Sequence, residues 1–292
     1  MDVLSDVMAV VRTGQPRSAR HQWRSPWAQR FDPVPGSIGF QVILQGPCRL
    51  TREGAAPVDL AAGDIVLRPR GRGHTLASGP GEDSTTASVC GAYQLDAGHA
   101  LALLDDLPEL IHLPGHLDRQ PQLRATAELL ATELDRPRPG TAAIVPALLD
   151  ILLLHMLRTW LDQQSAGGVA NGWAAALRDP PIAGALRAMH RDLARSWTVA
   201  ALAAEAGLSR TEFARRFALL LGRPPLAYLT WWRMTTAGRL LLQSDAPLRV
   251  IAAEVGYRSE FAFASAFKRH FGIAPGAHRR GGNPVARSGS DR

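Results

Sequence analysis

The C-terminal third of this 292-residue chain contains an internal repeat, with an offset of about fifty residues between its two copies. The segment Leu202-Ala-Ala-Glu-Ala-Gly207 returns as Ile251-Ala-Ala-Glu-Val-Gly256. Each copy reads as a short helix, a glycine turn, a second helix with aromatic residues one turn apart on its buried face, and a Gly/Pro stop. These aromatic residues are Phe213 and Phe217 in the first copy and Phe263 and Phe267 in the second. The repeat therefore predicts two helix-turn-helix units.

The residues around the turns predict how each unit is built. Gly207 and Gly256 permit the left-handed backbone of a tight turn. Ser209, followed by Glu212, predicts a capping box at the start of the second helix of the first unit. A helix over Ala227–Gln243 would hold the two units at a fixed separation. The two second helices could then enter successive major grooves, about 34 Å apart, on one face of DNA.

Basic residues are concentrated in the same third of the chain. From Leu186 onward there are 17 Lys and Arg against 7 Asp and Glu, whereas the preceding residues have 16 against 19. The net charge of +7 therefore arises wholly in the C-terminal third. Such segregation favours a polyanion-binding module joined to a neutral or acidic one.

Leu186–Arg280 resembles the tandem DNA-binding domain of the AraC/XylS family of transcriptional regulators. The stretches that carry the resemblance are Tyr228-Leu-Thr-Trp-Trp-Arg-Met234, Gly256-Tyr-Arg-Ser-Glu260 and Phe267-Lys-Arg-His-Phe-Gly-Ile-Ala-Pro275. The resemblance implies that outward residues of both second helices read bases, namely Arg210, Thr211, Glu212, Ala214 and Arg215, then Glu260, Phe261, Ala264 and Ser265. Members of the family often have an arginine at the position of Ser265. We therefore expect the second unit to contribute mainly phosphate contacts, through Lys268 and Arg269, and the first to read most of the sequence.

The N-terminal part has the pattern of a β protein followed by helices. Short apolar runs separated by Gly and Pro turns fill 37–74, and a further run covers Ala87–Leu95, as is typical of a β sandwich or barrel. From Pro121 the apolar period becomes helical, in two segments separated by a turn at Arg136–Gly140. The sequence thus predicts an α+β protein of two domains, with a β barrel or sandwich and a helical connector before the all-α C-terminal domain.

Gly63–His74 fits the second cupin motif, which is a Gly, five residues, Pro-x-Gly, two residues and a His. Together with Ser25-Pro-Trp27, Leu60–Asp64 and Val89-Cys-Gly91, it makes residues 1–118 resemble the cupin-like sensor domain of one AraC subgroup. Metal-binding cupins use at least three convergent donors, but Gln41 stands where a histidine would be wanted. We therefore expect no metal, no cofactor and no catalytic residue, with a cupin-type metalloenzyme fused to a DNA-binding module as the alternative.

A small β barrel without a metal can still enclose a small-molecule effector. The candidate lining residues are Trp23, Trp27, Gln41 and His74. A second sensing hypothesis is oxidation of Cys48 or Cys90, because a thiolate near a base such as Arg49 would be oxidisable. The competing interpretation is a buried, inert cysteine.

The predicted divisions are a sensor domain (1–118), a helical connector and linker (119–180), a tandem helix-turn-helix domain (181–283) and a disordered tail (284–292). The connector helices either pair two chains into a homodimer or belong to the core, and both interpretations stay open. An acidic N-terminus and an interrupted apolar stretch at Ile144–Leu161 favour a cytoplasmic protein with no membrane partner. The expected function is sequence-specific transcription regulation, as an activator controlled by an effector or oxidant, with double-stranded DNA, a small molecule and RNA polymerase as partners. An architectural DNA-binding role would leave the sensor-like domain unexplained.

Overall fold

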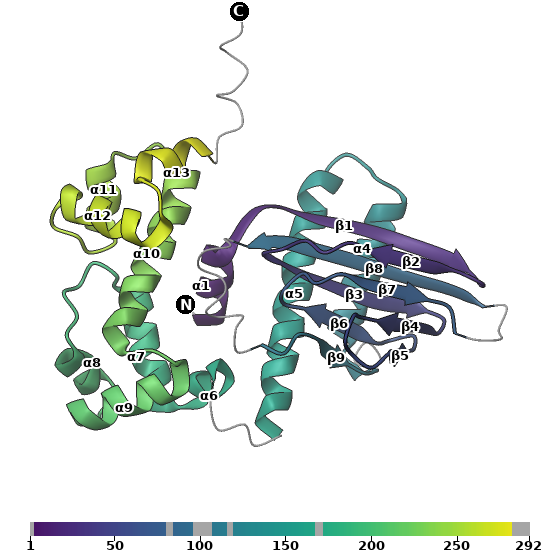
Figure 1. Ribbon diagram of the computed structural model, residues 1–292, viewed down its shortest axis with the longest axis horizontal. Helices are drawn as coiled ribbons and strands as arrows, with labels where there is room; N and C mark the ends of the chain where they lie inside the picture. Colours follow the sequence, from purple (N-terminus) through teal and green to yellow (C-terminus); the bar gives the residue numbers. More distant parts are fainter. Residues whose placement is uncertain (1–2, 80–83, 96–106, 116–118, 167–171, 282–292) are drawn as a thin grey trace, which may run out of the picture. The chain divides into compact units, whose positions relative to one another are not determined.

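The computed structural model describes residues 3–79, 84–95, 107–115, 119–166 and 172–281, which form two compact units (Figure 1). One unit consists of Arg12–Gly167, and the other combines Met1–Val11 with Gly168–Arg292. The predicted tail at 284–292, the boundary at residue 118 and most of the linker lie outside the described residues. The division into sensor, connector and DNA-binding segments therefore stays a prediction about function.

The unit Arg12–Gly167 is a β sandwich of two antiparallel sheets. Sheet A has five strands in the order β1 (Arg12–Arg24), β8 (Thr85–Leu95), β3 (Ser37–Gln45), β6 (Ile65–Arg68) and β9 (Ile111–Leu113). Sheet B has four, in the order β2 (Ala28–Phe31), β7 (His74–Ala77), β4 (Cys48–Thr51) and β5 (Val58–Leu60). In the described part of the chain no strand pairs across the two sheets, so the cupin-like unit is an open sandwich and not a closed barrel.

Packing explains which strands the sequence reveals. In β4 and β7 buried residues alternate with half-buried ones, as expected of strands with one face toward the core. Strand β3 is buried from Ser37 to Ile43 because both faces of sheet A are covered. The apolar runs of these strands are therefore visible in the sequence, whereas the polar edge strand β1 is not.

Helices α4 (Pro121–Asp135) and α5 (Thr141–Ala166) pack against each other and against sheet A (Figure 1). The Tyr93 hydroxyl donates to Asp150 on α5 at 2.7 Å. A Cβ at Gly91 would lie 2.8 Å from Leu149 Cδ2, so the glycine lets α5 approach the sheet closely. By length and composition α5 is apolar enough to cross a membrane, but Leu149, Leu152 and Met156 are buried within this unit. Core packing accounts for that part of its apolar character.

The second unit contains the predicted repeat. Its helices are α1 (Val3–Val11), α6 (Trp173–Arg178), α7 (Pro180–Arg191), α8 (Val199–Glu205), α9 (Arg210–Leu221), α10 (Pro225–Gln243), α11 (Leu248–Glu254), α12 (Glu260–Phe271) and α13 (Pro275–Gly281). The two helix-turn-helix units, α8–α9 and α11–α12, are confirmed, and α10 joins them. Gly207 and Gly256 have φ of +65° and +81°, the left-handed conformation expected at both turns.

Helix α1 packs on α7 and α10, although the chain continues from it directly into β1. Val3 and Val7 are buried there. Asp6 Oδ2 lies 3.3 Å from His190 Nδ1, and the Tyr228 hydroxyl lies 2.8 Å from His190 Nε2. Because a carboxylate can only accept, Nδ1 carries the proton and Nε2 accepts from Tyr228. The first residues of the chain thus complete the core of the helical unit.

Candidate nucleic-acid interface and effector pocket

Helix α9 presents a polar face on a well-anchored frame. The Ser209 hydroxyl accepts from the Glu212 backbone N–H at 3.2 Å, which is the N-cap half of the predicted capping box, whereas the Glu212 carboxylate accepts from Arg215. Phe213 and Phe217 are fully buried, and this fixes the rotation of the helix. The opposite face carries Arg210, Thr211 and Arg215 exposed and Glu212 and Ala214 half-buried. The residues predicted to read bases in the first unit therefore share one accessible face.

The two adjacent arginines of α9 have different partners. Arg215 donates from Nε and Nη2 to the Glu212 carboxylate, at 3.0 and 2.8 Å, and its side chain is 63% exposed. The hydrogen bond from Arg215 lowers the pKa of Glu212 below its usual value. Arg216 instead donates from Nε to Asp179 at 2.6 Å. Since Asp179 also caps α7, Arg216 ties α9 to that helix, whereas Arg215 is accessible to a ligand.

Helix α12 repeats the frame with a different outer face. The Ser259 hydroxyl accepts from the Ala262 N–H at 3.3 Å, and Phe263 and Phe267 are buried. Phe261 is 86% exposed, and so large an exposed apolar side chain is typical of a surface that binds a ligand. The remaining predicted residues are Glu260, Ser265, Lys268 and Arg269, all exposed, and Ala264, half-buried. This face has two cations near the C-terminal end of the helix and an apolar ring near its start.

In the sandwich, His74 is the centre of a buried hydrogen-bonded chain. Arg68 Nη1 donates to His74 Nδ1 at 2.7 Å, so Nε2 carries the proton and donates to Gln41 Oε1 at 3.3 Å. Gln41 Nε2 donates onward to Ser88 Oγ at 3.2 Å. Burial, together with the charges of Arg68 and Arg52, lowers the pKa of His74 to about 3. The ring is therefore neutral and fully used in the network.

An array of aromatic rings connects three of the four predicted effector residues, Trp23, Trp27 and His74. Trp23 stacks on Trp27 with ring centroids 4.3 Å apart, and His21 stacks on Trp23 at 5.1 Å. Phe31 meets His21 edge-on at 5.7 Å and stacks on His74 at 4.6 Å. Sequence reasoning missed His21 and Phe31, because nothing in the local pattern shows that β1 and β2 bring them to His74.

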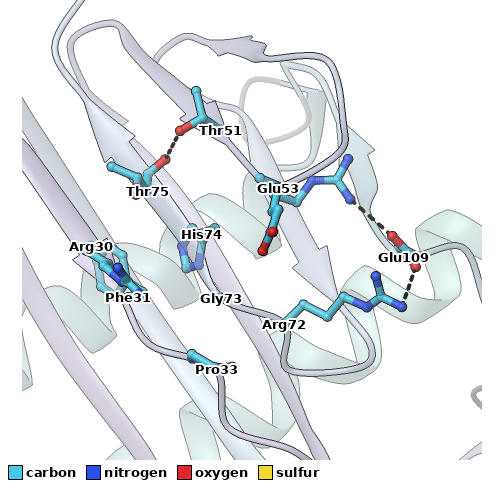
Figure 2. Close-up of a pocket in the computed structure, with 11 residues that line it drawn as sticks. Arg30, Phe31, Pro33, Thr51, Glu53, Arg72, Gly73, His74, Thr75 and Glu109 are labelled. Atoms are coloured by element: carbon cyan, nitrogen blue, oxygen red, sulfur yellow. Dashed lines mark hydrogen bonds and ion pairs between the residues drawn. The ribbon is translucent and has the colours of Figure 1, made fainter.

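A pocket of about 590 Å³ opens beside this array (Figure 2). Of the four predicted residues His74 lines it, while Gln41 is fully buried and the two tryptophans lie along the ring array. The lining also includes residues that the sequence analysis did not select, among them Phe31, Arg52, Arg72 and Glu109. The alternation Arg68-Pro-Arg70-Gly-Arg72 inside the cupin motif was a visible signal for the basic side, but Glu109 is distant in sequence.

The described residues contain no group of three His, Cys, Asp or Glu side chains that could hold a metal ion. Burial, with the charge of Asp64, raises the pKa of Cys48 to about 12, and burial also raises the pKa of Cys90. Arg49, the base expected to activate Cys48, is instead bound to Asp59 at 2.6 Å. Oxidation of either cysteine stays a hypothesis, but the low-pKa thiolate that it requires is opposed by burial.

Known proteins match both units. A family model described as "Cupin" matches residues 2–162, and one described as "Helix-turn-helix domain" matches residues 202–281. A putative AraC-like transcription regulator of Streptomyces lividans is 36% identical, over 96% of this chain and 98% of its own length. The regulator AlkR of Acinetobacter baylyi is 30% identical, over 96% and 99%. The solved DNA-binding domain of AdpA, in complex with a target DNA, is 34% identical over 39% of this chain and 99% of that one, with a TM-score of 0.34.

A sensor-type sandwich joined to a tandem helix-turn-helix unit defines a DNA-binding transcription regulator. Both family models and the full-length relatives agree with that class. The chain belongs to the AraC family of transcriptional regulators, with a cupin-like N-terminal domain, as the sequence predicted.

Proposed function

We propose that this regulator is an activator that reads DNA bases chiefly with α9, grips the backbone with α12, and responds to a small effector bound in the sandwich. The observation that carries the proposal is the outer face of α9, where Arg215 is accessible while Arg216 is bound to Asp179. An arginine fork with a single movable partner can exchange that partner for the O6 and N7 of a guanine.

The exposed residues of α12 support a division of labour. Lys268 and Arg269 are suited to phosphate contacts, which add affinity for any sequence. Phe261 offers an apolar contact of the kind that thymine methyl groups make. None of the four α12 residues predicted to read bases is an arginine, so we assign less sequence discrimination to α12 than to α9.

The remaining features of the proposal concern partners and setting. We propose a cytoplasmic, non-enzymatic protein that acts with RNA polymerase. Activation is supported by a relative from Escherichia coli, named the RCS-specific transcriptional activator RclR, which is 30% identical over 83% of this chain. Exposed apolar residues on α4 and α5, Leu129, Ile144 and Ile151, are the surface that we propose for a homodimer.

Binding-site selection from a random DNA library, followed by footprinting, tests the proposal directly. We expect a single short site with two protected major-groove segments. Arg215→Ala should weaken binding to that site by about 1 to 3 kcal/mol and leave binding to random DNA nearly unchanged. Arg269→Ala should weaken both alike and reduce the salt dependence of binding.

Arg136→Ala is the matched control, since it removes an exposed arginine from the turn between α4 and α5 and should change neither affinity. Equal losses on selected and random DNA for Arg215→Ala would refute base reading by α9. Uniform protection along the DNA would instead favour an architectural protein.

A further inference from the structure

The pocket of the sandwich carries an excess of positive charge. Arg30, Arg52 and Arg72 line it, against the two carboxylates of Glu53 and Glu109. Arg30 is highly exposed and is paired outside the pocket, with Asp32 at 3.2 Å. The charge that matters is therefore that of the arginines gathered around Glu109.

Glu109 is shared by three arginines. Its carboxylate lies 2.9 Å from Arg72 Nη2 (Figure 2), 3.8 Å from Arg52 Nη1 and 4.0 Å from Arg70 Nη1. A single guanidinium has more N–H donors than one carboxylate has acceptor sites, so Glu109 cannot satisfy both Arg52 and Arg72. Arg52 is only 17% exposed, and its buried Nε has no hydrogen-bond partner. Among the described residues, Glu109 is therefore too small an anionic partner for Arg52 and Arg72 together.

An aromatic surface faces this arginine cluster across the pocket. Phe31 and His74 stack on each other, and Figure 2 shows them on the opposite side of the pocket from Arg72 and Glu109. Pro33 continues this surface. Because His74 is buried, neutral and hydrogen-bonded to Gln41 and Arg68, this side has the character of an aromatic surface. A volume of about 590 Å³ is within the usual range for a small-molecule site.

We propose that the pocket binds an organic carboxylate, whose charged group replaces that of Glu109 on Arg52 and Arg72 while its apolar body packs against the stacked pair of Phe31 and His74. The proposal rests on the function proposed above, in which the sandwich is the sensor, and it names the class of effector. In the absence of effector, the Glu109 carboxylate thus occupies the arginine site, and the effector displaces it. Glu109 lies two residues before β9, an edge strand of sheet A. Release of Glu109 from the arginines is therefore a route by which effector binding alters the sheet.

Calorimetric titration of the purified full-length protein with sodium benzoate, at constant ionic strength, tests this exchange. Benzamide, which has the same shape without the charge, should bind at least about tenfold more weakly, because charge-assisted hydrogen bonds to guanidinium groups are lost. Arg72→Gln should weaken benzoate binding by about tenfold or more. Arg72 is 65% exposed, so the variant should fold. Arg17→Gln removes the same charge from an exposed side chain of β1 and should leave benzoate binding unaltered.

Glu109→Gln supplies the decisive measurement. It removes the competing carboxylate and should tighten benzoate binding by about tenfold. Glu53→Gln is its matched control in the same pocket, because among the described residues the Glu53 carboxylate forms no ion pair with Arg52 or Arg72, and it should change benzoate affinity far less.

Several results would overturn the proposal. Benzamide or inorganic phosphate could bind as tightly as benzoate, or Glu109→Gln could leave benzoate binding unchanged or weaker. Alternatively, neither the unmodified protein nor Glu109→Gln would bind benzoate up to about 10 mM. The titration contains no DNA, so its failure leaves base reading by α9 untouched. Conversely, benzoate could bind with the expected affinities in all variants while leaving DNA affinity unchanged. That result would support the carboxylate site and refute control of DNA binding by the effector.

Discussion

Arg216 and Asp179 join two helices of the DNA-binding unit at the scale of single side chains. Asp179 accepts from the Ile182 N–H at the start of α7 as well as from Arg216, and its side chain is only 10% exposed. A nearly buried carboxylate that loses its cation keeps the cost of desolvation without the compensating attraction. The pair therefore stabilises the position of α9 against α7.

This pair predicts opposite results for two neighbouring substitutions. Arg216→Ala should lower the free energy of unfolding by about 2 kcal/mol, discounted for the partial exposure of the arginine. Arg215→Ala should change it by less than about 0.5 kcal/mol, because that side chain is exposed. Urea unfolding followed by circular dichroism measures both. Equal stability of the two variants would contradict a structural role for Arg216.

At the scale of elements, the two turns of the repeat are not equivalent. A Cβ at Gly207 would meet nothing within 4 Å, whereas one at Gly256 would lie 2.5 Å from Arg233 Nη2 and 2.6 Å from the Leu193 carbonyl oxygen. Arg233 donates to this oxygen from both Nε and Nη2, at 3.0 and 2.7 Å. The second turn is thus packed against an arginine that anchors the loop after α7, and the first turn is open.

The difference predicts unequal costs for the same substitution. Gly207→Ala should destabilise by about 1 kcal/mol, through the positive φ alone. Gly256→Ala should cost about 3 kcal/mol, because the methyl group must also displace Arg233 or the Leu193 carbonyl. Thermal and urea unfolding of the two variants gives the comparison. A Gly256→Ala protein as stable as Gly207→Ala would mean that the arginine contact is unimportant.

At the scale of the whole molecule, the described residues of each unit include one deeply buried neutral histidine. Burial lowers the pKa of His74 in the sandwich and of His190 in the helical unit to about 3, from 6.5. As the pH falls through 6.5, these two histidines become protonated in the unfolded chain but stay neutral in the folded chain. The stability that these rings contribute is therefore complete above pH 6.5 and is lost progressively toward pH 3.

We accordingly expect both units to lose stability between pH 7.5 and 5, each with a slope approaching about 1.4 kcal/mol per pH unit. Thermal unfolding across this range measures the slope. His190→Gln should flatten it for the helical unit, although its stability at pH 7.5 will fall with the loss of the contacts to Asp6 and Tyr228. His155→Gln, the same change in the other unit, should leave the slope of the helical unit intact. An unchanged slope in His190→Gln would contradict the assignment.

Much of the fold could be predicted from the sequence, because it is written in short-range patterns. The repeat, the glycine turns and the Ser209 cap each depend on residues within one or two turns of each other. The apolar runs of β3, β4, β5, β6 and β8 are likewise local. These patterns suffice for the class of protein and for the face of α9 that we assign to DNA.

The tertiary structure alone decided the features that depend on distant partners. Strand β1 has no apolar alternation, and it forms because β8 offers it hydrogen bonds at an edge of sheet A. The sequence placed Arg215 and Arg216 side by side, but only the position of Asp179 separates their roles. In the same way, Glu109 enters the pocket from a segment far from the cupin motif. Local periodicity determines which helices and strands form, whereas the pairing of charges and edges depends on where the folded chain brings them together.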